Sequence, residues 1–381
     1  MERSRSGLWG LIGAVLVAGL ATLSASAQEP APPPPKPDAT VDTKPNLTGV
    51  LQFDYRRADS DDRKGPEHEF SVRRARLGLS GKATHRIAYD VVLQLDGGSP
   101  LSASLLDGSV DVTFKDWAKL RVGQFKYDFD IEGREAASAL IFMDRSFTAN
   151  TVAGSLDGSS TSSRPAAAFR DRGASLLGKV KSGHWKWTYA MGLFQGTGRA
   201  SDNNSGFALV ARVSVEPAKG LRIGTGIIGN DAKERGVEGR NHYTAWTVGG
   251  EYEWRKLLLR AEYYGAERDR GTATQDLSGF YVMGGYSVWK NVELLVRYQR
   301  LQDGQFAAGN DVLDSIDLAA KWYIARRGKR AGTALAVNYL IRSADDGINK
   351  GVTLLNDGRG NALTSGAEVG SVLMARVQVH F

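Results

Sequence analysis

The chain has 381 residues, including 45 glycines and no cysteine, and its formal net charge is +7. A chain of this length without cysteine is not one of the small secreted domains that disulfides hold together. Its mean hydropathy of -0.30 is typical of soluble proteins, and also of membrane barrels in which half of each strand faces water. The basic charge suggests an anionic partner.

The first 46 residues have the features of an exported protein. Arg3 and Arg5 precede an apolar run from residue 8 to residue 23, and the small residues Ala25 and Ala27 follow it. This order predicts a secretory signal peptide that is cleaved, over residues 1–27. A permanent transmembrane helix would need about twenty clean apolar residues, and this run is shorter and contains glycines. The prolines at 32–35 predict an extended periplasmic linker over residues 28–46.

Residues 47–381 follow one sequence pattern, in which short segments with alternating apolar and polar side chains are separated by turn residues. Alternation with a period of two indicates β-strands that have one apolar and one polar face. We therefore predict an all-β, transmembrane antiparallel β-barrel of about sixteen strands. The expected strands lie at 47–56, 71–81, 86–96, 105–114, 118–125, 170–180, 184–194, 206–216, 220–229, 242–254, 256–265, 277–288, 290–300, 314–324, 331–342 and 369–381.

The last expected strand ends on an aromatic residue. Counting back from the terminus, Phe381, Val379 and Val377 share one face, and Gln378 and Arg376 share the other. We expect the first set to face lipid and the second to face the lumen. After a secretion signal, this strand resembles the closing strand of bacterial outer-membrane barrels, whose terminal Phe is read by the barrel assembly machinery. The resemblance implies the outer membrane of a Gram-negative bacterium.

The connections between the expected strands alternate in length. Short links, such as 82–85 and 181–183, predict periplasmic turns, and polar stretches, such as 266–276 and 302–313, predict longer extracellular loops. A barrel with both termini on the periplasmic side has short and long connections in alternation, whereas the fold of a soluble sandwich does not require this pattern. The link at 126–165 occupies the position of the third extracellular loop, which folds into the lumen and narrows it in general porins. We expect the same here.

Arginines recur on the face that should line the lumen. A guanidinium on the lipid face would cost about 2–4 kcal/mol at the midplane, so alternation places Arg74 and Arg76 inward. Arginine stays charged and can bind an oxyanion through two hydrogen bonds. The expected anion path consists of Arg74, Arg76, Arg121, Lys126, Arg212, Arg222, Arg260 and Arg297.

Inward carboxylates leave a second interpretation open, a mixed-charge wall in which acids pair with these arginines. The expected inward acids are Asp90, Asp96, Asp107, Asp111, Glu251, Glu253, Glu262, Glu293 and Asp317. The expected inward loop is rich in Ser, Gly and Ala over 154–163 and has no lysine cluster there.

Two segments carry a more specific resemblance. They are FSVRRARLGLSG at 70–81 and LRVGQFK at 120–126, followed by Glu132 and the segment FMDRS at 142–146. They are similar to the phosphate-selective porin O and P family. Beyond residue 146 the similarity is limited to the alternating strand pattern that barrels share. The resemblance implies a sixteen-stranded, usually trimeric barrel with an arginine-lined path and a lysine-containing constriction that favours phosphate-like anions.

Other motifs do not point to a different function. The glycines of the G-x-G-x-x-G match at 224–229 lie within an expected strand and no helix follows, which argues against a dinucleotide site. The five histidines are scattered without zinc-ligand spacing, and none accompanies a convincing serine motif. We expect no enzyme activity, no metal, no cofactor and no nucleic-acid partner.

The function predicted from the sequence is passive diffusion of small, phosphate-like anions through a water-filled outer-membrane channel. The alternatives are a general non-selective porin and a structural or adhesin-type barrel. The expected partners are small anions, outer-membrane lipid, lipopolysaccharide, the barrel assembly machinery through Phe381, and two further copies of the chain in a homotrimer.

Overall fold

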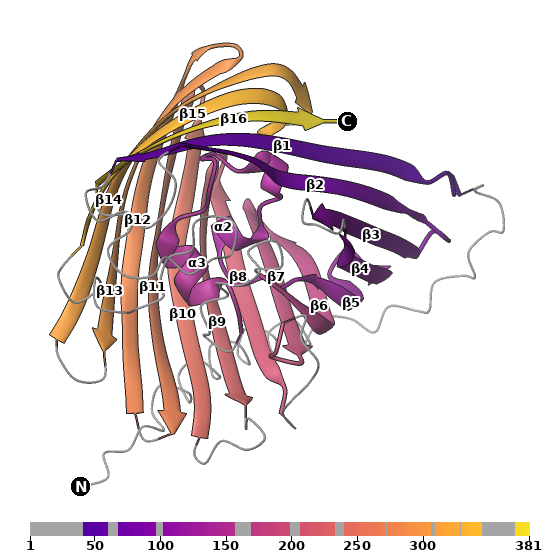
Figure 1. Ribbon diagram of the computed structural model, residues 1–381. Helices are drawn as coiled ribbons and strands as arrows, with labels where there is room; N and C mark the ends of the chain where they lie inside the picture. Colours follow the sequence, from indigo (N-terminus) through magenta and orange to yellow (C-terminus); the bar gives the residue numbers. More distant parts are fainter. Residues whose placement is uncertain are drawn as a thin grey trace, which may run out of the picture. The chain divides into compact units, whose positions relative to one another are not determined.

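A computed structural model describes residues 41–59, 68–96, 102–156, 169–198, 206–232, 240–271, 273–305, 309–327, 329–344 and 370–381. Within them, each strand pairs antiparallel with its neighbours in sequence, and β1 pairs with β16 to close a sixteen-stranded barrel (Figure 1). The fold predicted from the alternation is confirmed. The expected signal peptide and most of the expected linker lie outside the described residues.

The strands agree closely with those expected. They are β1 (Asn46–Asp59), β2 (His68–Lys82), β3 (Ile87–Asp96), β4 (Ser102–Lys115), β5 (Ala118–Lys126), β6 (Arg170–Ser182), β7 (Trp185–Phe194), β8 (Ala208–Ala218), β9 (Leu221–Ala232), β10 (Arg240–Trp254), β11 (Leu257–Gly271), β12 (Ala273–Trp289), β13 (Val292–Gln305), β14 (Gly309–Arg327), β15 (Ala331–Ala344) and β16 (Gly370–His380).

Two of the expected extracellular loops are strand instead. β11 continues to Gly271 and β12 resumes at Ala273, within the segment expected to be the loop 266–276. Likewise, β13 continues to Gln305 and β14 begins at Gly309. Outside the membrane both faces of a strand meet water, so the apolar alternation stops although the ladder of backbone hydrogen bonds continues. Alternation therefore located the part of each strand that crosses the membrane.

The side chains divide between the two faces of the barrel as expected. In β16, Val377 and Val379 are exposed on the outer face, whereas Arg376 and Gln378 are buried on the inner face, which confirms the predicted register. Large aromatic side chains remain exposed near the periplasmic turns, where an aromatic girdle would meet the membrane interface. They include Phe114, Trp117, Trp185, Trp254, Trp289 and Phe381.

Cysteine labelling provides a direct check of this division, because the chain has no native cysteine. The Arg121 side chain is on the inner face and 30% exposed, and Val122 is an exposed residue of the outer face. In membranes, a water-soluble thiol reagent should label Arg121→Cys faster than Val122→Cys, because lipid covers the outer face. The opposite order of rates would show that the register of β5 is wrong.

The long connection between β5 and β6, residues 127–169, is here called L3, and its described residues 127–156 and 169 lie inside the barrel (Figure 1). Its described part contains α2 (Ile131–Arg134), the 3-10 helix η1 (Ala137–Ala139) and α3 (Phe147–Ala153), which strands surround in Figure 1. Apolar side chains of L3 and of the inner wall form one buried cluster. The expected inward third loop is confirmed. Among the described residues, no helix has the length and apolar character needed to cross a membrane.

Candidate channel lining

L3 is attached to the inner wall through a fully buried ion-pair triad. The Arg297 guanidinium of β13 lies 2.7 Å from Asp317 of β14 and 3.2 Å from Glu132 of L3. Its plane also lies over the Phe142 ring, 4.4 Å from the centroid. Asp317 accepts further hydrogen bonds from Gln299 and Ser315. Because both partners are buried, loss of one would leave the other as an uncompensated charge.

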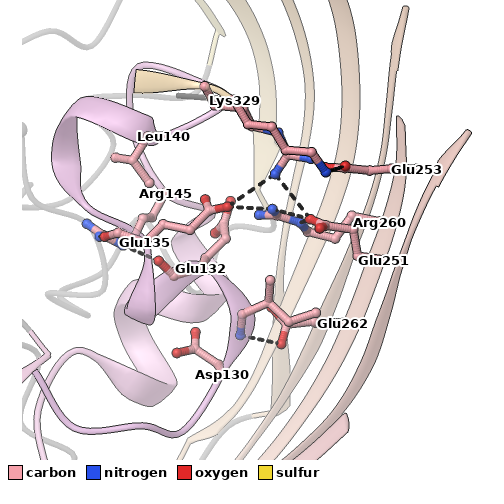
Figure 2. Close-up of polar contacts among 12 residues, drawn as sticks. Asp130, Glu132, Glu135, Leu140, Arg145, Glu251, Glu253, Arg260, Glu262 and Lys329 are labelled. Carbon is pink, nitrogen blue, oxygen red and sulfur yellow. Dashed lines mark hydrogen bonds and ion pairs between the residues drawn. The ribbon is translucent and has the colours of Figure 1, made fainter. Parts of the chain in front are cut away.

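A second attachment joins L3 to two other parts of the wall. Arg260 of β11 donates to Glu135 of L3 at 2.5 Å and also to Glu251 of β10. Arg330, next to the β14–β15 turn, lies 3.5 Å from Glu135 and 3.3 Å from Glu251. Figure 2 shows Glu135 reaching from L3 toward Arg260 and Glu251. The guanidinium groups on this side of the lumen are thus paired with carboxylates.

Substitution of Asp317 should destabilise the barrel strongly. Asp317→Ala would leave Arg297 buried beside Glu132 alone, and breaking a buried pair in this way costs about 3–5 kcal/mol of unfolding free energy. Asp314→Ala, in the same strand, is the matched control, because Asp314 is partly exposed, lies 3.8 Å from Arg300 and accepts a hydrogen bond from the Tyr298 hydroxyl. Such pairs contribute about 0–1 kcal/mol. Denaturant unfolding in lipid vesicles measures both, and equal losses would contradict the role of the triad.

The opposite side of the lumen begins where β4 and β5 separate. Their pairing ends at Gly108 and Gln124, whereas β5 and β6 stay paired up to Lys126 and Arg170. Gly123, just before this point, has a φ of 131°, which a side chain would strain. Arg170 spans the separation and binds Asp107 of β4 through two hydrogen bonds, of 2.8 and 2.9 Å.

A group of basic side chains collects on this side, and we call it the basic cluster. The charges of Arg145, Arg170 and Arg76 all act on Lys126, and those of Arg73, Arg76 and Arg376 act on Arg74. These interactions connect the ends of β5 and β6 to β2, β1 and β16. The basic cluster consists of Arg56, Arg73, Arg74, Arg76, Lys126, Arg145, Arg170 and Arg376.

Four members of the basic cluster bind only neutral groups within the described residues. Arg74 donates to the Gln52 amide at 2.7 Å, and Arg76 donates to the Gln94 amide at 2.6 Å. Lys126 donates to the carbonyl oxygen of Gly133 at 2.8 Å and to that of Glu135. Arg145 donates to two L3 carbonyl oxygens. These four basic side chains are therefore held in place without a direct ion pair in the described part of the chain.

One L3 carboxylate, Asp144, lies at the other end of the cluster. It is 3.4 Å from Arg73 and 3.8 Å from Arg376, and its side chain is 30% exposed. Burial alone would raise the pKa of Asp144, but the charges of Arg73, Arg376, Arg74 and Arg56 outweigh it and hold the pKa well below its usual range. Asp144 therefore remains a charged hydrogen-bond acceptor among guanidinium groups.

The residues expected to form one anion path are distributed over several environments. Arg74, Arg76 and Lys126 meet in the basic cluster, whereas Arg260 and Arg297 bind the L3 carboxylates. Arg121 is paired with Asp111 through two hydrogen bonds of 2.6 and 2.8 Å. The remaining two lie on β8 and β9, where Arg212 is buried and Arg222 is exposed.

Sequence reasoning missed four members of the cluster, namely Arg56, Arg73, Arg145 and Arg170, and it placed Arg376 toward the lumen without including it in the expected anion path. Arg73 has no partner in β1, because a bulge sets Gln52 opposite Arg74 and Phe53 opposite Val72. The bulge interrupts the alternation of inward and outward side chains, so two consecutive arginines both reach the interior. The FMDRS segment contained Arg145, but only the path of L3 reveals its neighbours. Among the described residues there is no group of three or more side chains suited to hold a metal ion.

Comparisons with known proteins agree with this architecture. The family model of phosphate-selective porin O and P matches residues 46–223, and no curated protein sequence matches the chain. The chain is similar to an anion-selective porin from Comamonas acidovorans, with 14% identity, a TM-score of 0.66, and coverage of 89% of this chain and 99% of that one.

Two further solved structures share the fold. OmpT of Vibrio cholerae, solved in a trimer form, has 14% identity and a TM-score of 0.62 over 89% of this chain and 99% of its own. The outer-membrane channel DcaP of Acinetobacter baumannii has 12% identity and a TM-score of 0.61 over 88% and 96%. The family and the fold are those of a channel rather than an enzyme. Residues 46–223 therefore match the phosphate-selective porin O and P family, and the chain has the fold of an outer-membrane β-barrel porin.

Proposed function

We propose that this porin conducts small anions in preference to cations, and that the basic cluster sets the preference. The observation that carries the proposal is that Arg74, Arg76, Lys126 and Arg145 bind only neutral acceptors within the described residues. Fixed basic side chains without ion-pair partners, set in the low-dielectric wall of a water-filled lumen, raise the local concentration of anions. Several weak sites in series then let an anion enter and leave.

Reversal potentials in lipid bilayers test this proposal. With a potassium chloride gradient across a bilayer that contains the wild-type porin, the potential should indicate chloride permeability above potassium permeability. A reversal potential of the cation-selective sign would contradict it.

The proposed solutes are phosphate or polyphosphate-like anions. Arginine matches the planar geometry of two oxyanion oxygens, and four arginines surround Asp144. An ionised carboxylate only accepts hydrogen bonds, so beside these arginines it favours an oxyanion that still carries a proton. Hydrogen phosphate has such a proton at neutral pH, whereas sulfate and chloride have none.

Substitution of Asp144 should therefore change discrimination between oxyanions. In the wild-type channel we expect phosphate to block chloride current at a lower concentration than sulfate does. Asp144→Ala removes the acceptor for the phosphate proton, so the ratio of the two blocking concentrations should move toward one, by about tenfold or more, the effect of one hydrogen bond to a charged group. An unchanged ratio would contradict this role, and comparing two anions in one variant cancels any general change in charge.

A general porin with a mixed-charge wall is the second candidate. The pairs that Asp111 forms with Arg121 and Lys119 favour it, because they neutralise part of the lining on β4 and β5. In that case the reversal potential would lie close to zero, and phosphate would not block the chloride current.

The remaining features of the proposal concern export and assembly. We propose that residues 1–27 are a cleaved signal peptide, that 28–46 form a periplasmic linker, and that Phe381 is read by the assembly machinery. A homotrimer is supported by the trimer form described for the Vibrio cholerae structure. The exposed apolar outer face supports contact with outer-membrane lipid and lipopolysaccharide.

A further inference from the structure

Where L3 leaves the barrel wall, two carboxyl groups meet around one tyrosine hydroxyl. The Tyr264 hydroxyl of β11 lies 3.0 Å from Asp130 Oδ2 and 3.0 Å from Glu262 Oε2. The Tyr281 hydroxyl of β12 donates to the same Glu262 oxygen at 2.5 Å. All four side chains are buried, and Figure 2 shows Asp130 and Glu262 close together beside α2.

The two carboxyl groups also hold the backbone at the start of L3. The Ile131 amide donates to Glu262 at 2.8 Å, and the Gly133 amide donates to Asp130 at 3.0 Å. The bond between Ile131 and Glu262 joins L3 directly to β11. Since α2 also carries Glu132, its position is linked to that of the Arg297 triad.

Counting protons shows that the two carboxyl groups cannot both be ionised in this arrangement. Tyr264 has one hydroxyl proton and can donate it to only one of them. Its other contact, also at 3.0 Å, is a hydrogen bond only if that carboxyl group carries a proton and donates it to the tyrosine oxygen. With both groups ionised, an oxygen lone pair would face a carboxylate.

Charged groups of both signs face the two carboxyl groups. The facing charged groups are Glu132 and Arg145 of L3, Arg260 of β11 and Arg212 of β8. Arg260 is engaged by two other carboxylates, and Arg145 donates to carbonyl oxygens. Within the described residues, neither Asp130 nor Glu262 has an ion-pair partner. Burial, together with the charge of Glu132, raises the pKa of Asp130 above its usual range.

We propose that one proton shared between Asp130 and Glu262 fastens the start of L3 to β11, and that its loss at alkaline pH releases α2 from the wall. A group that must be protonated in the bound state contributes stability that is present at low pH and is lost as the pH rises. Release would allow α2, with its Glu132 and the adjacent Glu135, to move within the lumen. The channel would then carry a pH-sensitive attachment of its constriction loop.

Hydrogen exchange in the full-length porin, reconstituted in lipid nanodiscs, tests this proposal. Exchange of the peptide that covers residues 127–136 should be measured from about pH 6 to about pH 10 and corrected with a β8 peptide for the intrinsic effect of pH. Over the pH range in which the attached pair holds the proton and the released pair does not, corrected exchange should rise about tenfold per pH unit, because opening then releases one proton. Above that range it should level off. Wild-type exchange that stays flat over the whole measured range would overturn the proposal.

Two variants isolate the shared proton. Asp130→Asn keeps the shape and supplies an amide N–H to the Tyr264 oxygen without titrating, so it should remove the alkaline rise. Glu262→Gln should also remove the alkaline rise, and it replaces Asp130→Asn in the test if that variant does not fold. Asp128→Asn is the matched control, since Asp128 is paired with Arg134 and partly exposed, and it should keep the wild-type pH course. If Asp130→Asn and Glu262→Gln both keep the alkaline rise, the proposal is wrong.

Discussion

Arg76→Glu is expected to shift the porin from anion preference toward cations. Arg76 is bonded to an amide rather than to a carboxylate, and it lies within reach of the charges of Arg170 and Arg145. The substitution changes the local charge by two units. At about 7 Å and an effective dielectric constant of about 40, this amounts to roughly 2 kcal/mol, which salt reduces. The chloride-to-potassium permeability ratio should therefore fall by about tenfold in reversal-potential measurements.

Lys219→Glu is the matched control for this measurement. It makes the same change of two charge units on an exposed residue of the β8–β9 turn, outside the basic cluster. A permeability ratio that changes equally in both variants would mean that total charge, and not the cluster, sets the preference. Lys126→Glu is a less clean substitution than the sequence implied, because Lys126 also holds two carbonyl oxygens of L3.

The barrel could be predicted from the sequence because each strand is specified by a pattern among neighbouring residues. The alternation in β16, for example, needs only neighbouring residues to separate Val377 and Val379 from Arg376 and Gln378. The third loop was also predictable, because the order of short and long connections gives its position. These features follow from a two-residue period and from the membrane, which penalises polar groups on the outer face.

The charged lining could be predicted only in part, because its contacts join distant residues. Arg376 binds Asp54, 322 positions away in the sequence, and Arg297 binds Glu132, 165 positions away. Parity correctly placed both arginines on the inner face, but it does not distinguish an arginine bound to a carboxylate from one bound to an amide. At Arg73 parity itself fails because of the bulge. The partner of each charge depends on the path of L3, which no periodic pattern encodes.

Gly49→Ala is expected to impair closure of the barrel. The backbones of Gly49 and Phe381 exchange two hydrogen bonds, of 2.8 and 3.1 Å, where β1 meets the chain terminus. The Phe381 ring lies directly over Gly49, so an added Cβ would fall 2.1 Å from a ring carbon. The ring must then leave its place and expose the junction of the first and last strands. Such overpacking costs about 1–3 kcal/mol, and the cost falls on the contact that completes the barrel.

Refolding into lipid vesicles separates this packing role from recognition by assembly machinery, because none is present there. The fraction of folded barrel, read from heat-modifiable mobility on gels, should fall for Gly49→Ala and for a chain that lacks Phe381. Gly284→Ala is the control, since its Cβ would lie 3.7 Å from Leu259 and 3.9 Å from Val296, in ordinary contact on the same outer face. If Gly49→Ala refolds as completely as Gly284→Ala, the ring tolerates displacement. Any effect of deleting Phe381 in cells would then belong to recognition rather than to closure.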